Sequence, residues 1–189
     1  SYEVQIGNGN QMSIAPLSYS YGSLAPGISY NLRVRATNSV GSSAFSANVA
    51  CLTDSTEPDV PAQPSPCSGE TGFTVDLAWL APLPNGEPIF NYNIEIDGSS
   101  YGDVSTTSET ITGLLPGVTY DFRVRADNSV GSSGYSPVRS CTTQSLPPQA
   151  PSAPVCTQNA YDRLTVTWTA PDPQGSPIND YDLLQDGSI

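Results

Sequence analysis

The sequence predicts an all-β chain built from antiparallel β-sandwiches arranged in tandem. Three observations lead to this prediction. The 18 Pro and 16 Gly are spread along the 189 residues, which is typical of many short elements joined by turns. Apolar and polar residues alternate in several segments, and no segment has the period of an amphipathic helix. One unit of about 90 residues also recurs along the chain.

The repeat appears when the chain is compared with itself. The segment "YNLRVRATNSVGSSAFS" begins at Tyr30 and returns as "YDFRVRADNSVGSSGYS" from Tyr120, 120 − 30 = 90 residues later. A second register places Trp168 after Trp79 by 168 − 79 = 89 residues. The unit is therefore present once in full and twice in part. The predicted domains are a partial repeat at 1–54, a complete repeat at 55–145 and a second partial repeat at 146–189.

Within the unit, a period of two predicts half-buried strands. "FTVDLAW", from Phe73 to Trp79, places its apolar residues on one face, as do "YNIEI" from Tyr92 and "YDFRVRA" from Tyr120. The segments between them are rich in Gly, Pro, Asn and Ser, which adopt turn dihedrals at low cost. About seven short strands per repeat, without helical periodicity, predict an antiparallel sandwich.

Composition excludes several classes of function. The net charge is −12, all six basic residues are Arg, and the chain has no Lys or His. Without His there is no imidazole base and no His metal ligand, and without Lys there is no amine to form a Schiff base. We therefore predict no enzyme, no cofactor and no metal site. An acidic chain is repelled by phosphate backbones, which argues against nucleic acid as a partner. No stretch approaches the roughly 18 apolar residues of a membrane span, so no membrane insertion is expected.

Several motifs, in this order, resemble the fibronectin type III repeat. They are "WLAP" and "WTAP", a Gly-x-Pro-Ile turn, a Tyr that opens the next strand, and "LLPGVTYDFRVRADNSVGSSGYS". The resemblance covers essentially the whole chain and implies fibronectin type III-like (immunoglobulin-like) antiparallel β-sandwiches, one complete and two partial. It also implies a tyrosine corner, in which a phenol bonds back to the backbone a few residues upstream. The core positions that it implies are Trp79, Tyr92, Leu114 and Tyr120 in the complete repeat, and Tyr30 and Trp168 in the partial ones.

The four cysteines occupy regular positions, Cys67 and Cys156 early in a repeat and Cys51 and Cys141 near its end. Two pairings are open: across the linkers, Cys51 with Cys67 and Cys141 with Cys156, or within one repeat, Cys67 with Cys141. The resemblance implies that strands A and G run in the same direction along one side of the sandwich, which favours Cys67 with Cys141. Cys51 and Cys156 would then pair with residues of the segments that complete the partial repeats.

Either pairing implies an oxidising compartment, and we expect an extracellular or cell-surface location. A zinc site is the alternative use of these thiols. The cross-linker pairs, spaced by 67 − 51 = 16 and 156 − 141 = 15 residues without His, are unlike the usual close clusters of zinc ligands.

The outward face of the repeated strand carries charge. Arg123 and Arg125 flank Val124, and we expect them to form cross-strand ion pairs with Glu95 and Asp97. An Arg-lined ligand face is the alternative. "NSVGSSG" after this strand is expected to be a tight turn, with a recognition loop as the alternative.

The partial repeats would each expose an apolar sheet face. We therefore expect protein–protein contacts with neighbouring repeats of a longer array, or with copies of the same protein in a filament that places Cys156 opposite Cys51 of the neighbour. "LPPQAPSAP" from Leu146 is expected to be a stiff, extended linker between two repeats.

The predicted function is a non-catalytic extracellular structural or adhesive spacer. Two alternatives stay open: the ligand-binding ectodomain of a cell-surface receptor, and an accessory module of a secreted carbohydrate-active enzyme. A third, an intracellular giant scaffold, would require free thiols in place of paired disulfides.

Overall fold

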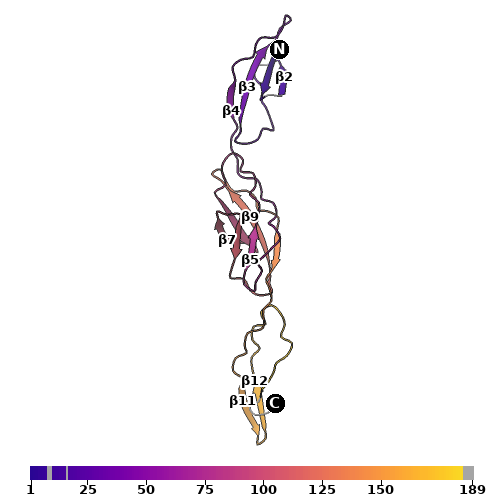
Figure 1. The fold of residues 1–189 in the computed structure, drawn as a ribbon, viewed down its shortest axis with the longest axis vertical. Helices are drawn as coiled ribbons and strands as arrows, with labels where there is room; N and C mark the ends of the chain where they lie inside the picture. The colour runs from indigo at the N-terminus through magenta and orange to yellow at the C-terminus, as the bar shows by residue number, and fades with distance from the viewer. Residues whose placement is uncertain (8–9, 16, 185–189) are drawn as a thin grey trace.

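The computed structural model describes residues 1–7, 10–15 and 17–184, and every regular element in this part of the chain is a β-strand. Figure 1 shows three parts that follow one another along a single line. The strands are β1 (Tyr2–Ile6), β2 (Asn10–Ile14), β3 (Ser29–Ala36), β4 (Val49–Leu52), β5 (Val75–Ala78), β6 (Asn91–Ile96), β7 (Ser99–Val104), β8 (Ser108–Ile111), β9 (Thr119–Asp127), β10 (Arg139–Thr142), β11 (Val155–Ala160) and β12 (Arg163–Thr167).

The middle part is an antiparallel sandwich, which confirms the predicted fold class. Its larger sheet has the order β10-β9-β6-β7, and β5 pairs with β8 in the smaller one. Alternation in β9 buries Phe122, Val124 and Ala126 and leaves the intervening arginines on the outer face. The core between the sheets consists of Val75, Leu77, Trp79, Tyr92, Ile94, Ile111, Leu114, Phe122, Val124, Ala126 and Cys141.

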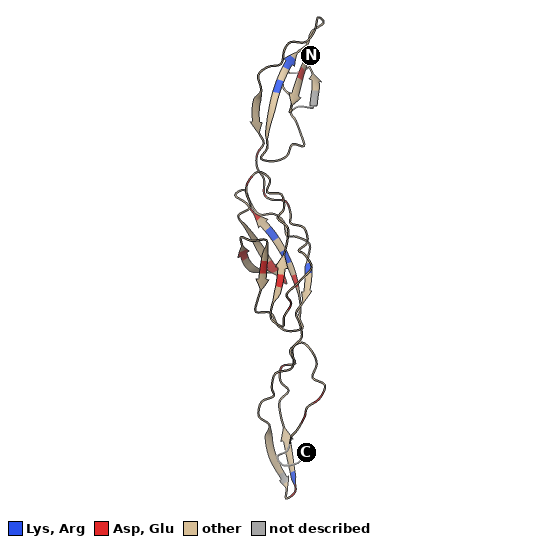
Figure 2. Cartoon of the chain, in the orientation of Figure 1, with Lys and Arg blue, Asp and Glu red and all other residues tan. Residues whose placement is uncertain are grey.

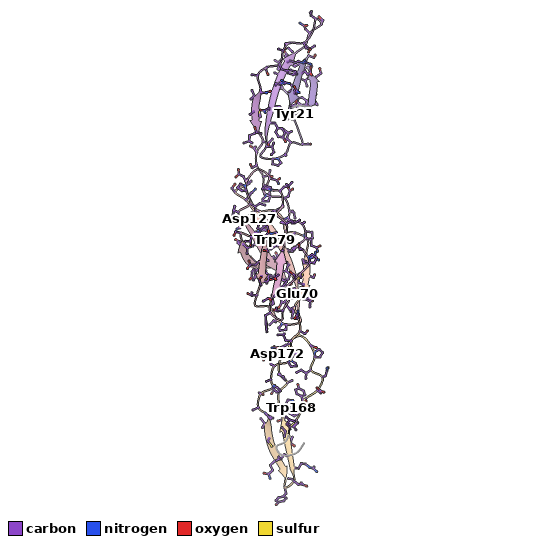
Figure 3. All side chains as sticks on the ribbon, in the orientation of Figure 1. Tyr21, Glu70, Trp79, Asp127, Trp168 and Asp172 are labelled. Atoms are coloured by element: carbon purple, nitrogen blue, oxygen red, sulfur yellow. A yellow bond between two sulfur atoms is a disulfide. The ribbon has the colours of Figure 1, made fainter. Side chains whose placement is uncertain are left out.

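Two aromatic residues of this core pack against each other. Trp79 is only 4% exposed and meets Tyr92 edge to face, with 5.5 Å between the ring centroids. Figure 3 labels Trp79 within the sandwich. Burial raises the pKa of the Tyr92 phenol above its ordinary value, so this side chain stays neutral.

One residue of the predicted inward face does not face the core. Phe73 is 49% exposed, although it has the same parity as the buried Val75. The hydroxyl oxygen of Thr71 accepts hydrogen bonds from the backbone N–H groups of Phe73 and Thr74, at 3.1 and 3.0 Å. This local turn precedes β5, so the alternation of the strand does not extend back to Phe73.

A tyrosine corner precedes the central strand in two of the three parts. The Leu115 N–H donates to the Tyr120 hydroxyl at 2.9 Å, and the Ala25 N–H donates to the Tyr30 hydroxyl at 3.0 Å. In both turns a glycine adopts the left-handed backbone conformation, Gly117 with φ of 65° and Gly27 with φ of 62°. The phenol therefore fixes how the chain enters the strand.

Replacing Tyr120 by Phe is expected to lower the free energy of unfolding by about 1 kcal/mol, because it removes this hydrogen bond and keeps the ring. Tyr101→Phe, on the exposed face of β7, is the matched control and is expected to change stability by less than about 0.5 kcal/mol. Urea unfolding followed by tryptophan fluorescence measures both variants. Equal losses in the two would contradict the assigned role of the Tyr120 hydroxyl.

The outer parts contain portions of the same fold. The first is a sheet of order β2-β1-β3-β4, in which β1, β3 and β4 correspond to β6, β9 and β10 of the middle part. The last contains the hairpin β11-β12 and an edge-to-face pair, Trp168 with Tyr181, at 5.3 Å between centroids. Trp168, predicted as a core residue, is 41% exposed, because no second sheet covers it within the described residues.

Candidate functional site

The most organised polar cluster lies on the outer face of β9. The guanidinium carbons of Arg123 and Arg125 lie 5.2 and 5.4 Å from the ring centroid of Tyr135. The first part repeats the arrangement with Arg33 and Arg35 at 4.4 and 4.6 Å from the ring of Phe45. Two cations on one aromatic ring form what we call the Arg–aromatic stack.

Two serines hold the aromatic residue in position. The Ser133 and Ser136 hydroxyl oxygens accept hydrogen bonds from the backbone N–H groups of Ala126 and Val124, at 2.9 and 3.0 Å. The backbone N–H groups of the same serines donate to the Ala126 and Val124 carbonyls, both at 2.8 Å. This pairing fastens the segment on either side of Tyr135 to the edge of β9. Ser43 and Ser46 make the same bonds in the first part.

Acidic and amide side chains on the neighbouring strand complete the stack. Glu95 accepts a hydrogen bond from Arg123, at 2.9 Å from Nε, so the predicted ion pair between these residues is present. The Tyr135 hydroxyl donates to the Asn93 side-chain oxygen at 2.7 Å. Figure 2 shows acidic and basic residues on neighbouring strands of the middle part.

The two copies of the stack differ at two positions that contact each other in one of them, the aromatic residue and a residue of the neighbouring strand. Glu3 corresponds to Asn93, since 93 − 3 = 90, and it pairs with Arg35 at 2.7 Å. Phe45 has no hydroxyl to offer, so the carboxylate at this position binds an arginine instead. Where the aromatic residue is Tyr135, an amide replaces the carboxylate and receives the phenol.

The predicted pairing of Asp97 with an arginine is wrong. The Asp97 carboxylate accepts a hydrogen bond from the backbone N–H of Asp121 at 2.8 Å. Asp97 follows β6 and has a left-handed φ of 49°, so the chain turns there and the side chain leaves the row of arginines. The carboxylate that lies near Arg125 is instead that of Asp127, with 3.9 Å from Nε to Oδ1.

The segment after β9 is a tight turn, in agreement with the prediction. The Asn128 side-chain oxygen accepts hydrogen bonds from the backbone N–H groups of Val130 and Gly131, at 3.0 and 3.1 Å. Its amide group donates to the Thr56 and Pro84 carbonyls, at 2.8 and 3.0 Å. The Asn128 side chain is only 4% exposed, and its hydrogen bonds connect this turn to the start of the repeat at Thr56.

A disulfide joins the start of the middle part to its end. Cys67 and Cys141 are bonded, with 6.0 Å between their Cα atoms and 74 residues of sequence separation. Cys141 lies in β10 and is buried against the core. Cys51 and Cys156 are free and exposed in the single chain, where each lies in an outer part.

The contacts of these sites join side chains within one part of the chain. The Arg–aromatic stack holds its cations on carboxylates, amides and rings, and each cation–π contact contributes about 0.5–1 kcal/mol at an exposed position. Among the described residues, no three His, Cys, Asp or Glu side chains gather as metal ligands. The described residues also include no helix that is long and apolar enough to cross a membrane.

A complete β-sandwich flanked by portions of the same fold, with a tyrosine corner and an Arg–aromatic stack in both the first and the middle part, defines a modular β-repeat. The chain belongs to the fibronectin type III family. The model of the fibronectin type III domain matches residues 62–142, which include both bonded cysteines.

Relatives of the chain are long proteins. Fibronectin type-III domain-containing protein 3A of Mus musculus is 31% identical over 180 residues, which are 86% of this chain and 15% of the relative. Phosphatidylinositol phosphatase PTPRQ of Rattus norvegicus is 32% identical over 157 residues, 79% of this chain and 6% of the relative. The chain therefore spans a small fraction of each of these proteins.

Among solved structures, the sixth fibronectin type III domain of human fibronectin type III domain containing protein 3 is 30% identical. The match covers 52% of this chain and 97% of the solved domain, with a TM-score of 0.44.

Proposed function

We propose that the chain is a non-catalytic structural spacer that works outside the cell. The observation that supports this most directly is the succession of like repeats along one line, with the polar outer face of the complete repeat committed to internal bonds (Figure 1). Such a module separates whatever is attached to its two ends. This role needs a stable fold of fixed length and does not require a reaction centre.

The cysteine chemistry supports the extracellular part of the proposal. A bond that closes 74 residues of sequence persists in an oxidising compartment, whereas cytosolic thiols are kept reduced. The net charge of −12 keeps such a chain soluble and opposes adhesion to nucleic acid or other polyanions.

The partners in this proposal are like repeats, supplied by the neighbouring segments of a longer array or by copies of the same chain. The first part has an apolar face formed by Val4, Leu32 and Val34, and these residues correspond to the buried Ile94, Phe122 and Val124. In the complete repeat, β5, β8 and the Trp79 side chain cover that face. The last part exposes Trp168, which corresponds to Trp79. The first part therefore exposes a face that a Trp covers in the complete repeat, and the last part exposes such a Trp.

One preparation tests both proposals. The chain is expressed with a secretion signal, recovered from the medium and examined by nonreducing peptide mapping, small-angle X-ray scattering and sedimentation. We expect the Cys67–Cys141 bond, an extended particle, and association that increases with concentration and yields a Cys51–Cys156 bond between chains. Reduced Cys67 and Cys141 or a compact particle would overturn the spacer proposal. A monomer at all concentrations would overturn only assembly between copies.

A further inference from the structure

The linker between successive parts is almost fully hydrogen bonded. After β4, the Thr53 N–H donates to the Ile28 carbonyl and the Gly27 N–H donates to the Asp54 carbonyl, both at 3.1 Å. These bonds belong to the first part. Two residues further on, the Thr56 N–H donates to the Asn85 carbonyl at 3.1 Å, inside the middle part. Only Ser55 separates the last backbone bond of one part from the first bond of the next.

The second linker repeats this pattern. The Gly117 N–H donates to the Gln144 carbonyl at 3.2 Å, and the Leu146 N–H donates to the Gln174 carbonyl at 3.0 Å. Ser145 is the residue between them, and its hydroxyl donates to the Gly175 carbonyl at 3.1 Å.

The prolines after Leu146 therefore do not form the linker that the sequence predicts. The Gln149 N–H already donates to the Asp172 carbonyl of the last part at 3.0 Å, so the proline-rich segment follows the junction. Figure 3 labels Asp172 on the side of the last part that faces the middle part. A proline-rich composition predicts an extended backbone, but it does not reveal which loop this segment hydrogen bonds to.

Two glycines meet at each junction. The tyrosine-corner glycine of one repeat, Gly27 or Gly117, lies against a glycine in the loop before β6 or its equivalent in the next repeat, Gly86 or Gly175. A Cβ atom added to Gly86 would lie 2.5 Å from the Gly27 Cα and 2.5 Å from the Ser55 hydroxyl oxygen. Carbon atoms in contact are about 3.5–4 Å apart, so no side chain fits at this position.

The other junction shows the same close approach. A Cβ atom on Gly175 would lie 2.5 Å from the Gly117 Cα and 2.5 Å from the Pro116 carbonyl oxygen. All four glycines have left-handed backbone angles, with φ between 62° and 99°. The absence of a side chain therefore serves both the turn and the approach of the two backbones.

The sequence repeats the whole arrangement in register. The spacings are 117 − 27 = 90 for the first glycine, 145 − 55 = 90 for the serine and 175 − 86 = 89 for the second glycine. These are the spacings of the repeat itself. The junction is therefore encoded in each repeat and recurs wherever two repeats follow one another.

We propose that this pair of glycines, with the serine between the repeats, is an interface that fixes the orientation of each repeat on the next. The partner surface of one repeat is the tyrosine-corner turn of the repeat before it. A linker with a single residue between the backbone hydrogen bonds of the two repeats has little conformational freedom, and the contact between the two glycine backbones restricts it further. The inference deepens the spacer role and rests on it for its use, because a spacer of fixed geometry sets the angle as well as the distance between its ends.

Residual dipolar couplings of the isotope-labelled 189-residue chain test the proposal. The first and middle parts are expected to share one alignment tensor in the unmodified chain. Gly86→Ala is expected to separate the tensors, because its Cβ atom cannot fit against Gly27 and Ser55. Gly113→Ala is the matched control, since Gly113 also has a left-handed φ, 77°, but no heavy atom beyond its own residue and its chain neighbours lies within 4 Å of its Cβ position.

A second variant keeps the test decisive if Gly86→Ala fails to fold. Inserting Gly-Ser-Gly after Ser55 alters no residue of either repeat, and it is expected to give separate tensors as well. Independent tensors in the unmodified chain, or one shared tensor in both altered chains, would overturn the proposal. Both outcomes concern the orientation of adjacent repeats within one chain, so failure here is distinct from failure of secretion or of association between copies.

Discussion

Replacing Cys67 and Cys141 together by alanine is expected to lower the free energy of unfolding of the complete repeat by about 4 kcal/mol. The bond closes 74 residues of sequence, and in the chain-entropy account the restriction of the unfolded chain grows with the logarithm of the loop length. The chain has two tryptophans, so Trp168→Phe leaves Trp79 as the reporter of the core. Urea unfolding in this background measures the effect.

The control for this prediction uses the other two cysteines. Cys51 and Cys156 are free and exposed, and changing both to serine is expected to alter the unfolding of the complete repeat by less than about 0.5 kcal/mol. Reducing the unmodified chain should reproduce most of the loss seen with the alanine pair. Equal stability of the oxidised and reduced chains would show that the bond does not stabilise the repeat.

The second large effect is expected at the centre of the core. Phe122→Ala removes the largest of the fully buried side chains and should cost about 3–5 kcal/mol, from lost burial and from the cavity that remains. The same fluorescence measurement applies, and the urea midpoint should fall without a change of slope.

Phe73→Ala provides a control with the same chemical change. Phe73 is 49% exposed, so its loss is expected to cost less than about 1 kcal/mol. Comparable losses at Phe73 and Phe122 would mean that the inward face of the strand before Trp79 begins earlier than the structure places it.

The fold followed from features that a linear sequence displays. Alternation and a unit that returns after 90 residues are local or self-comparative signals, and they place Phe122 and Val124 in the core correctly. The error at Phe73 arose because the hydroxyl of Thr71 forms a turn where the alternation would have continued. A local hydrogen bond competes with strand extension, and parity alone does not detect it.

The outer face was predicted only in part. The sequence indicated the pair Glu95 and Arg123, because opposite charges on neighbouring strands suffice for that prediction. The ring between the arginines was missed, although an aromatic residue recurs as Phe45 and Tyr135 between paired serines. That recurrence was the available signal, since a turn alone needs no aromatic residue.

The contact between two glycines at each junction could not be predicted from the sequence. The glycine at the tyrosine corner and its partner belong to different repeats, and their separation of 86 − 27 = 59 residues matches neither register. Each glycine has a sufficient explanation in its own turn, so nothing in the composition signals that two turns meet. Only the placement of one repeat on the next reveals the second role.

The disulfide has a mechanical consequence. Tension along the chain enters the complete repeat at Ser55 and leaves at Ser145, and the covalent bond joins Cys67 to Cys141 inside these points. If the core gives way under pull, only (67 − 55) + (145 − 141) = 16 residue steps can straighten, or roughly 55 Å. The reduced chain releases 145 − 55 = 90 steps, roughly 315 Å. The oxidised repeat therefore lengthens far less than the reduced repeat when its core unfolds, so the oxidation state of Cys67 and Cys141 sets how far this part of the chain can extend.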